Sequence, residues 1–361
     1  LYDLASGQWI ATDPAGSMHD RARAYTLWLY RDALYHGGVG NAIYSDPPDY
    51  TDVIFRGGMG DSAIWTGTYL AAESLRLMAT GAADARRNVI SSVETLHLWF
   101  NVTGDLGVLA RWVVPTGQGA DSELDCAEPY HHCGVGYDGQ SWDYLGDISR
   151  DQYQGVMLGY ALAYEALGED GEAHRALIRE DVVELVHELM LERDVPVRVT
   201  VDGLPLPGFE MHLRFVILAT REAAGGAARI TVNTSDLGDS GMVGFREFMP
   251  NLAHAIRQIP GLGWAPDIPR AGTAIMLSSF FRVAMLVTDG VPGFEADHAA
   301  FVDYYYRHDE QGGNVEDWLT IARAWTYIGP CSDGYFGNNI TMQPMYNLSL
   351  IHISEPTRPT T

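Results

Sequence analysis

The chain has 361 residues, of which 47% are hydrophobic and 19% charged, so one large domain or two ordinary ones fit and wholesale disorder is excluded. Its 23 basic residues, all arginine, face 47 acidic ones, which gives a formal net charge of −24. A chain this acidic is repelled by nucleic acid and by anionic membranes, and no run of 18 apolar residues predicts a membrane-spanning helix. We therefore expect neither a nucleic-acid partner nor membrane insertion.

Both ends of the sequence have unusual features. The chain starts at Leu1 and not at a methionine. Its last residues, from Leu348, read LSLIHISEPTR, which is the in-frame translation of an adapter used in DNA library preparation. We expect a single domain at 1–347, truncated at both ends, and a foreign tail at 348–361. A bacterial environmental source follows from this, and a signal peptide outside the record would place the protein outside the cytoplasm.

Apolar residues three and four apart predict amphipathic helices along most of the chain. A glycine, Gly81, ends the second of them. An extended stretch at 197–201, before Asp202 and Gly203, predicts a small hairpin. The predicted helices span, in chain order, 17–35, 62–79, 83–100, 152–167, 172–191, 209–224, 241–258, 271–288, 293–307, 314–328 and a stretch from about 338.

An internal repeat organises these helices. GTYLAAESL at 67–75 aligns with GYALAYEAL at 159–167 at an offset of 92 residues, and each copy leads through a short turn into a second helix. Repeated helix pairs stack because one pair cannot bury its apolar face alone. The sequence thus predicts an all-α fold, an (α/α)6-type toroid with a few short strands and with long loops, 36–60 and 113–148, at one mouth. An open superhelix of helical repeats is the alternative.

Two stretches resemble a known superfamily. GDSAIWTGTYLAAESLRLMATG with VTGDLGVLAR, and SRDQYQGVMLGYALAYEALG, look like the six-hairpin glycosidases, and the resemblance covers roughly 50–330. The superfamily includes unsaturated glucuronyl hydrolases, other glycoside hydrolases, polysaccharide lyases and sugar epimerases. The resemblance implies the toroid and carbohydrate chemistry, and it implies no cofactor and assigns no catalytic residue.

Two acids stand near equivalent helix starts. Asp61 precedes the first repeat helix, and Asp151 lies two positions before its equivalent. Repeat-equivalent helices run in one direction, so both acids are expected at one mouth, where glycosidic cleavage needs two carboxyl groups. The alternative is structural: Asp61 caps its helix, and Ser149 with Gln152 forms a capping box that leaves Asp151 in the first turn.

Basic side chains near helix starts are candidates for binding an acidic sugar. Arg150 could hold a uronic carboxylate in bidentate fashion, or form an ion pair with an acid of the chain. His212 and Arg214, expected to open another helix, could add positive potential or be structural. Tyr153 is a candidate for binding the sugar and, with the histidines at 131 and 132, for the base of a lyase.

Aromatic and amide side chains complete the expected sugar site. The loop 126–148 carries rings that could stack on sugar faces or pack the loop itself, among them His131, His132 and Trp142. Trp65 is either a further platform or part of the core. Asn338 and Asn339, at the start of the last helix, could bind hydroxyl groups or cap that helix.

Cysteine usage does not predict a metal site. Cys126 and Cys133 bracket two histidines, but this spacing matches no common zinc motif. A local disulfide is expected if the protein is exported, and free thiols if it is not.

These patterns favour a glycoside hydrolase that acts on an oligo- or polysaccharide, including one with uronic acids, through Asp61 and Asp151. A non-catalytic glycan-binding module of a larger sensor or surface protein, and a polysaccharide lyase, are the alternatives. The sequence does not specify the sugar, the linkage or the oligomeric state.

Overall fold

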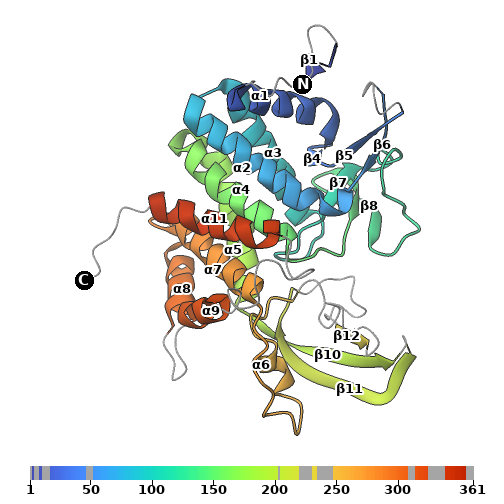
Figure 1. Cartoon of the computed structure of the whole chain (residues 1–361), viewed down its shortest axis with the longest axis vertical. Helices are drawn as coiled ribbons and strands as arrows, with labels where there is room; N and C mark the ends of the chain where they lie inside the picture. Colours follow the sequence, from blue (N-terminus) through green and yellow to red (C-terminus); the bar gives the residue numbers. More distant parts are fainter. Residues whose placement is uncertain are drawn as a thin grey trace.

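The computed structural model describes residues 2–3, 8–9, 17–45, 52–201, 204–218, 230–233, 247–307, 314–323 and 338–354. In these parts the protein is mostly helical, with several small sheets (Figure 1). The helices are α1 (Met18–Trp28), α2 (Ser62–Thr80), α3 (Ala83–Asn101), α4 (Gln152–Leu167), α5 (Glu172–Leu189), α6 (Ala253–Ile256), α7 (Ala271–Thr288), α8 (Glu295–Tyr306), α9 (Asn314–Arg323) and α11 (Asn338–Ser354).

The strands pair locally. Antiparallel pairs are β1 with β2, β3 with β4, and β5 with β6, while β7-β9-β8 and β11-β10-β12 form three-stranded sheets in which only β12 is parallel to its neighbour. The strands are β1 (Tyr2–Asp3), β2 (Gln8–Trp9), β3 (Leu34–Tyr35), β4 (Gly38–Val39), β5 (Asn41–Tyr44), β6 (Val53–Gly57), β7 (Trp112–Pro115), β8 (His131–Tyr137), β9 (Gln140–Leu145), β10 (Glu192–Val201), β11 (Leu204–Val216) and β12 (Ile230–Asn233).

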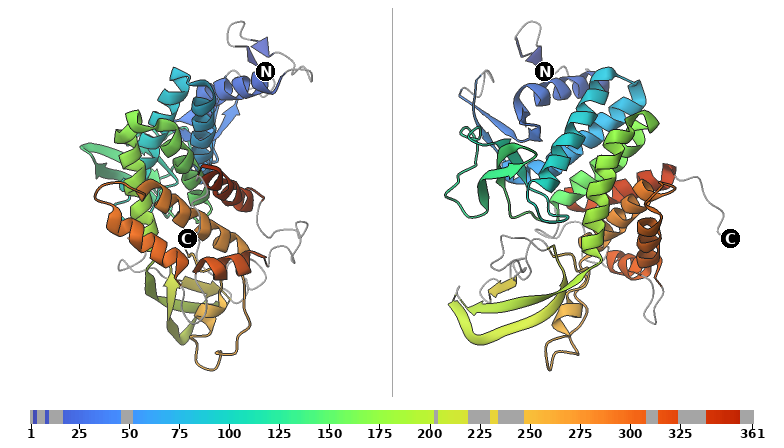
Figure 2. Two further views of the ribbon diagram at one scale, coloured as in Figure 1. Left: turned by 90° about the vertical axis from the view of Figure 1, so that its left-hand side faces the viewer. Right: turned by 180° about the vertical axis from the view of Figure 1, so that it is seen from behind.

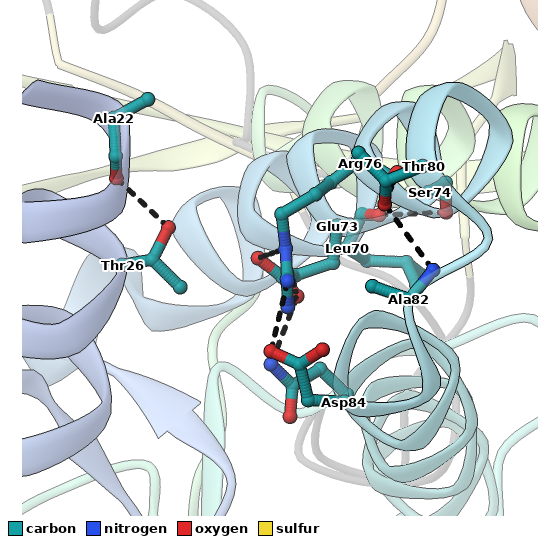
Figure 3. Close-up of polar contacts among 10 residues, drawn as sticks. Ala22, Thr26, Leu70, Glu73, Ser74, Arg76, Thr80, Ala82 and Asp84 are labelled. Carbon is teal, nitrogen blue, oxygen red and sulfur yellow. Dashed lines mark hydrogen bonds and ion pairs between the residues drawn. The ribbon is translucent and has the colours of Figure 1, made fainter. Parts of the chain in front are cut away.

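The first repeat unit is the hairpin of α2 and α3. Gly81 ends α2 in the left-handed conformation (φ 63°) and donates its backbone N–H to the carbonyl of Leu77 at 2.8 Å. Beside this turn the carboxylate of Glu73, 2% exposed, binds Arg76, which also reaches Asp84 on α3 at 2.8 Å (Figure 3). The amide of Asn88 donates to the same Glu73 carboxylate at 2.8 Å. These contacts fix the two helices at their shared end.

Helices α2 and α4 pack closely because glycines line their contact. A Cβ atom added to Gly155 would lie 2.1 Å from the carbonyl oxygen of Ile64, and one added to Gly159 would lie 2.4 Å from that of Gly67. Positions 64 and 67 of α2 thus meet positions 155 and 159 of α4 in the same order along both helices. The two helices are parallel neighbours in the register of the 92-residue repeat, as predicted.

Helix α7 continues this parallel arrangement. Arg150, before α4, and Arg270, at the N-terminal cap position of α7, bind the same residue, Glu247. Near the other ends of these helices, the hydroxyl of Tyr164 donates to the carbonyl of Val287 at 3.1 Å. The chain therefore carries three successive helical hairpins, α2/α3, α4/α5 and α7/α8, whose first helices run in one direction (Figures 1 and 2).

Two predicted helices are wrong. The segment predicted as a helix at 209–224 begins in β11, where the buried Leu213 and Phe215 alternate with the exposed His212 and Arg214. Of the predicted helix 241–258, the described residues contain only the four-residue α6. The hairpin expected around 197–201 is present but longer, as β10 and β11, while Asp202 and Gly203 lie outside the described residues.

The predicted long loops also contain regular structure. The segment 36–60 carries β4, β5 and β6, and the segment 113–148 carries β8, β9 and most of β7. Most of the strands are short, as expected, and β10 and β11 are longer.

Helices α7 and α11 relate to two predictions, that no segment spans a membrane and that the C-terminal tail is foreign. Ala271–Thr288 (α7) is long and apolar enough to cross a membrane, and 94% of it is buried inside the protein, as in the core helix of a globular domain. Helix α11 runs past position 347 to Ser354. The foreign origin of 348–361 stays a prediction.

Candidate functional site

The N-terminal ends of α2 and α4 lie at one place in the molecule. Gln152, fully buried at the start of α4, donates its side-chain amide to the Oδ1 atom of Asp61 at 2.9 Å. Its Oε1 atom accepts the backbone N–H of Ile64, in the first turn of α2, at 3.0 Å. One side chain thus joins the two helix starts, so Asp61 and Asp151 stand at the same end of the α2–α4 pair, which we call the mouth.

Asp61 occupies the N-terminal cap position of α2 without capping it. Its side chain makes no capping hydrogen bond and is 61% exposed. The N–H groups just before α2 are bound instead by Glu123, whose two carboxylate oxygens accept from Gly58 at 2.8 Å and from Met59 at 3.0 Å. The capping interpretation is therefore wrong for Asp61, and its carboxylate faces solvent.

Asp151 has the same position on α4. Its side chain makes no capping hydrogen bond and is half-buried. The capping box predicted for Ser149 and Gln152 is also absent, because the Gln152 side chain reaches across to α2. The hydroxyl of Ser149 instead accepts from Arg111 at 3.3 Å.

Arg111, which the sequence did not reveal as a site residue, binds the segments before both helices. Its guanidinium donates to the carbonyls of Asp147, before α4, and Gly60, before α2, and lies 3.9 Å from the Asp61 carboxylate. It is the one charged residue in the apolar run VLARWVVP, and that was the available signal. The Gln152 amide and the Arg111 guanidinium both lie at the Oδ1 atom of Asp61, so the exposed carboxylate can also accept a hydrogen bond from a ligand hydroxyl.

Trp65 lies one helical turn beyond Asp61 on α2. Residues four apart share a helix face, and Trp65 is 40% exposed. Its assignment to the core is wrong. An exposed indole beside an exposed carboxylate is an arrangement that suits the apolar face and the hydroxyl groups of a sugar.

Arg150 is occupied by an acid of the chain. Its guanidinium donates to the backbone carbonyl of Glu247 at 3.1 Å and lies 3.5 Å from the Glu247 carboxylate, which is fully buried and also bound by Arg270. Burial, followed by repulsion from Arg270, lowers the pKa of Arg150 to about 10. The ion-pair alternative is thus the one observed.

Tyr153 is not placed to meet a ligand. Its ring is fully buried, and its hydroxyl accepts from the N–H of Leu109 at 3.1 Å and donates to the carbonyl of Gly107 at 3.0 Å. Both its proposed roles, in sugar binding and as a lyase base, are therefore wrong.

The aromatic residues predicted on a loop belong to the β7-β9-β8 sheet. His131 bonds through Nδ1 to the backbone of Asp125, His132 stacks on Tyr144 at 4.5 Å, and the Trp142 indole donates to the carbonyl of Tyr137 at 3.1 Å. These rings pack the sheet and its connections, which is the alternative that the sequence left open.

A disulfide joins Cys126 and Cys133, as expected for an exported protein. The Asp143 carboxylate lies near both sulfurs, so these three residues form a possible ligand set by distance alone. However, the sulfurs are bonded to each other, and Asp143 already accepts from Thr116 and from the N–H groups of Gly117 and Gly134. This chemistry does not suit a metal ion.

The remaining predicted residues lie elsewhere. His212 and Arg214 stand on the exposed face of β11, where they pair with Asp194 at 3.0 Å and Glu192 at 3.1 Å, apart from the α2 and α4 starts in Figure 1. They open no helix. Asn338 and Asn339 begin α11, but their side chains lie outside the described residues.

No protein-family model, no curated protein and no solved structure matches this chain. The candidate functional site is therefore the mouth near Asp61, Trp65, Arg111, Asp151 and Gln152.

Proposed function

We propose that the protein is a carbohydrate-active enzyme, a glycoside hydrolase built on an (α/α)6-type toroid, with its active site at the shared mouth of α2 and α4. The observation that carries the proposal is that Asp61, just before α2, and Trp65, in the first turn of α2, are both exposed, while Gln152 brings the start of α4, with Asp151, alongside. The three parallel hairpins support the toroid, because its first helices all open at one mouth.

The chemistry follows from the partners of each acid. Hydrolysis needs one carboxyl group to protonate the leaving oxygen and a second to activate water or to attack the sugar carbon. Gln152 donates a hydrogen bond to Asp61, and the Arg111 guanidinium lies 3.9 Å away, so both hold the exposed Asp61 carboxylate in the position for the second role. The first role then belongs to Asp151.

The substrate is an oligo- or polysaccharide whose ring stacks on the Trp65 indole. Because Arg150 is bound by Glu247, the proposal does not require a uronic acid. Trp65 would serve a non-catalytic glycan-binding module equally well, so binding and turnover must be measured separately.

Replacing Trp65 by alanine is expected to weaken glycan binding by roughly tenfold or more, since loss of one stacking aromatic costs on the order of 1–2 kcal/mol. Binding to a glycan array, followed by titration of the best ligand and a reducing-end assay of its cleavage, measures this. The matched control is Trp264→Ala, which removes an exposed tryptophan, 76% accessible, from the segment after α6. Equal binding by both variants would place the glycan elsewhere.

A further inference from the structure

Histidine–carboxylate pairs join the second helices of successive hairpins. The Nδ1 atom of His97, on α3, lies 2.8 Å from Asp181 on α5, and Nε2 of His174, on α5, lies 3.2 Å from Glu94 on α3. The two pairs cross the same helix contact in opposite directions. This contact is thus held by groups whose attraction depends on the charge of histidine.

A third pair continues the series. The Nε2 atom of His187, near the end of α5, lies 2.7 Å from Asp297 on α8, and the His187 ring contacts Phe301 on α8 at 4.9 Å. Helices α3, α5 and α8 are therefore linked in sequence by three such pairs.

The His97–Asp181 pair is the most buried. Asp181 is 1% exposed and also accepts from the Tyr160 hydroxyl at 2.5 Å. Burial raises the pKa of Asp181 to about 6. Burial lowers the pKa of His97, but the Asp181 hydrogen bond and charge, with Glu180 and Glu184, outweigh it and raise the pKa overall.

Other titratable groups face this pair from neighbouring elements. Burial, and then the charges of Asp138, Glu180, Asp181 and Glu184, raise the pKa of Tyr137 at the tip of the β8–β9 hairpin. Burial, and then Asp181 and Glu180, raise the pKa of Glu184. The surroundings of His97 are thus predominantly acidic, which favours its protonated form.

We propose that the pairs His97–Asp181, His174–Glu94 and His187–Asp297 form a pH-dependent clasp that tightens the α3–α5–α8 layer as the pH falls below neutral. A protonated imidazole facing an ionised carboxylate makes each pair a charge-assisted hydrogen bond. At the buried pair, where Asp181 itself takes up a proton near pH 6, one proton shared between His97 and Asp181 keeps this hydrogen bond. When the imidazoles are neutral, only weaker contacts remain, and the acidic residues of α5 repel one another. The clasp is independent of the proposed glycan chemistry.

The sign follows from proton linkage. A raised pKa of His97 gives stability that is complete below its unfolded value of about 6.5 and is lost as the pH rises through the folded value. A raised pKa of Asp181 acts in the same direction, because its proton is held more tightly in the folded state between its ordinary value and about 6. Stability therefore falls as the pH rises from about 5 to 8.

The test is the thermal unfolding midpoint of the full chain between pH 5 and pH 8. The wild type is expected to lose about 3–6 °C over this range, and His97→Gln/His174→Gln/His187→Gln is expected to flatten the profile. The control His212→Gln/His254→Gln, whose pairs with Asp194 and Glu192 are more exposed, should keep the wild-type slope.

Two results would overturn the clasp. One is a wild-type midpoint that rises with pH, and the other is a triple variant that keeps the wild-type slope. If the triple variant does not fold, Glu94→Gln/Asp297→Asn decides, because it keeps every histidine, leaves the buried Asp181 intact and should still reduce the slope. An unchanged slope in that variant would refute the proposal.

Discussion

Replacing Gly155 by alanine is expected to destabilise the protein by about 3 kcal/mol or more, and so to abolish the native fold near physiological temperature. The added Cβ atom would lie 2.1 Å from the carbonyl oxygen and 2.8 Å from the carbonyl carbon of Ile64. Both are backbone atoms, so α2 and α4 would have to separate along their whole contact. Urea unfolding followed by circular dichroism measures the loss.

The matched control is Gly136→Ala on β8, where an added Cβ atom meets nothing within 4 Å. This variant is expected to unfold close to the wild-type midpoint. If Gly155→Ala and Gly136→Ala unfold at the same urea concentration, the close approach of α2 and α4 is not what holds the repeat together.

Replacing Glu247 by glutamine is expected to cost about 3 kcal/mol of unfolding free energy. The fully buried carboxylate stands between Arg150 and Arg270, and its loss leaves these two largely buried guanidinium groups facing each other without the carboxylate that they share. Since the pKa of Arg150 is already lowered to about 10 by burial and by Arg270, this site tolerates uncompensated charge poorly. Thermal or urea unfolding measures the effect.

Two further variants separate charge from packing at Glu247. Asp267→Asn, which removes the acid of the exposed pair with Arg257 at 2.9 Å, should change stability little. Replacing Arg150, Glu247 and Arg270 together by apolar residues of similar volume should cost less than Glu247→Gln alone, because no unpaired charge remains. A triple variant less stable than Glu247→Gln would contradict this account.

The sequence predicted the helical frame well, because apolar periodicity reports burial directly. The two similar segments, which are 92 residues apart in the sequence, pack against each other in the structure, where Gly67 contacts Gly159. The glycines of the repeat allow the two helices to approach at backbone distance, which the structure shows and the sequence analysis did not use. The direction of the helices, and hence the shared mouth, followed from the repeat alone.

The failures have local physical causes. EMHLRF at 210–215 was taken for a helix start, although its apolar residues alternate with polar ones as in a strand. Tyr153 reads as an amphipathic ring next to two polar residues, and only the fold shows its hydroxyl bound to the backbone at 107 and 109. Partners distant in sequence, such as Arg150 and Glu247, cannot be found from one chain.

In the candidate site, too, some features could be predicted from the sequence and others depend on residues distant in the chain. The sequence predicts that Asp61 and Asp151 share a mouth. It does not tell whether the Asp61 carboxylate caps α2 or is exposed to solvent. That choice depends on Glu123, which lies more than 60 residues beyond Asp61 and binds the N–H groups of Gly58 and Met59. Arg111 and Gln152 likewise gain their role only when the two helix starts come together.

Asp61 and Asp151 are proposed to cleave a glycosidic bond at this mouth. The most direct test is turnover of the best-bound glycan by wild type, Asp61→Asn and Asp151→Asn, with Asp170→Asn, an exposed acid beyond the opposite end of α4, as the control. Each of the first two variants should lose at least about 100-fold in turnover while still binding, because general acid–base groups contribute roughly 10²–10⁴-fold. Full turnover by both variants, or a product carrying a new double bond, would contradict the hydrolase.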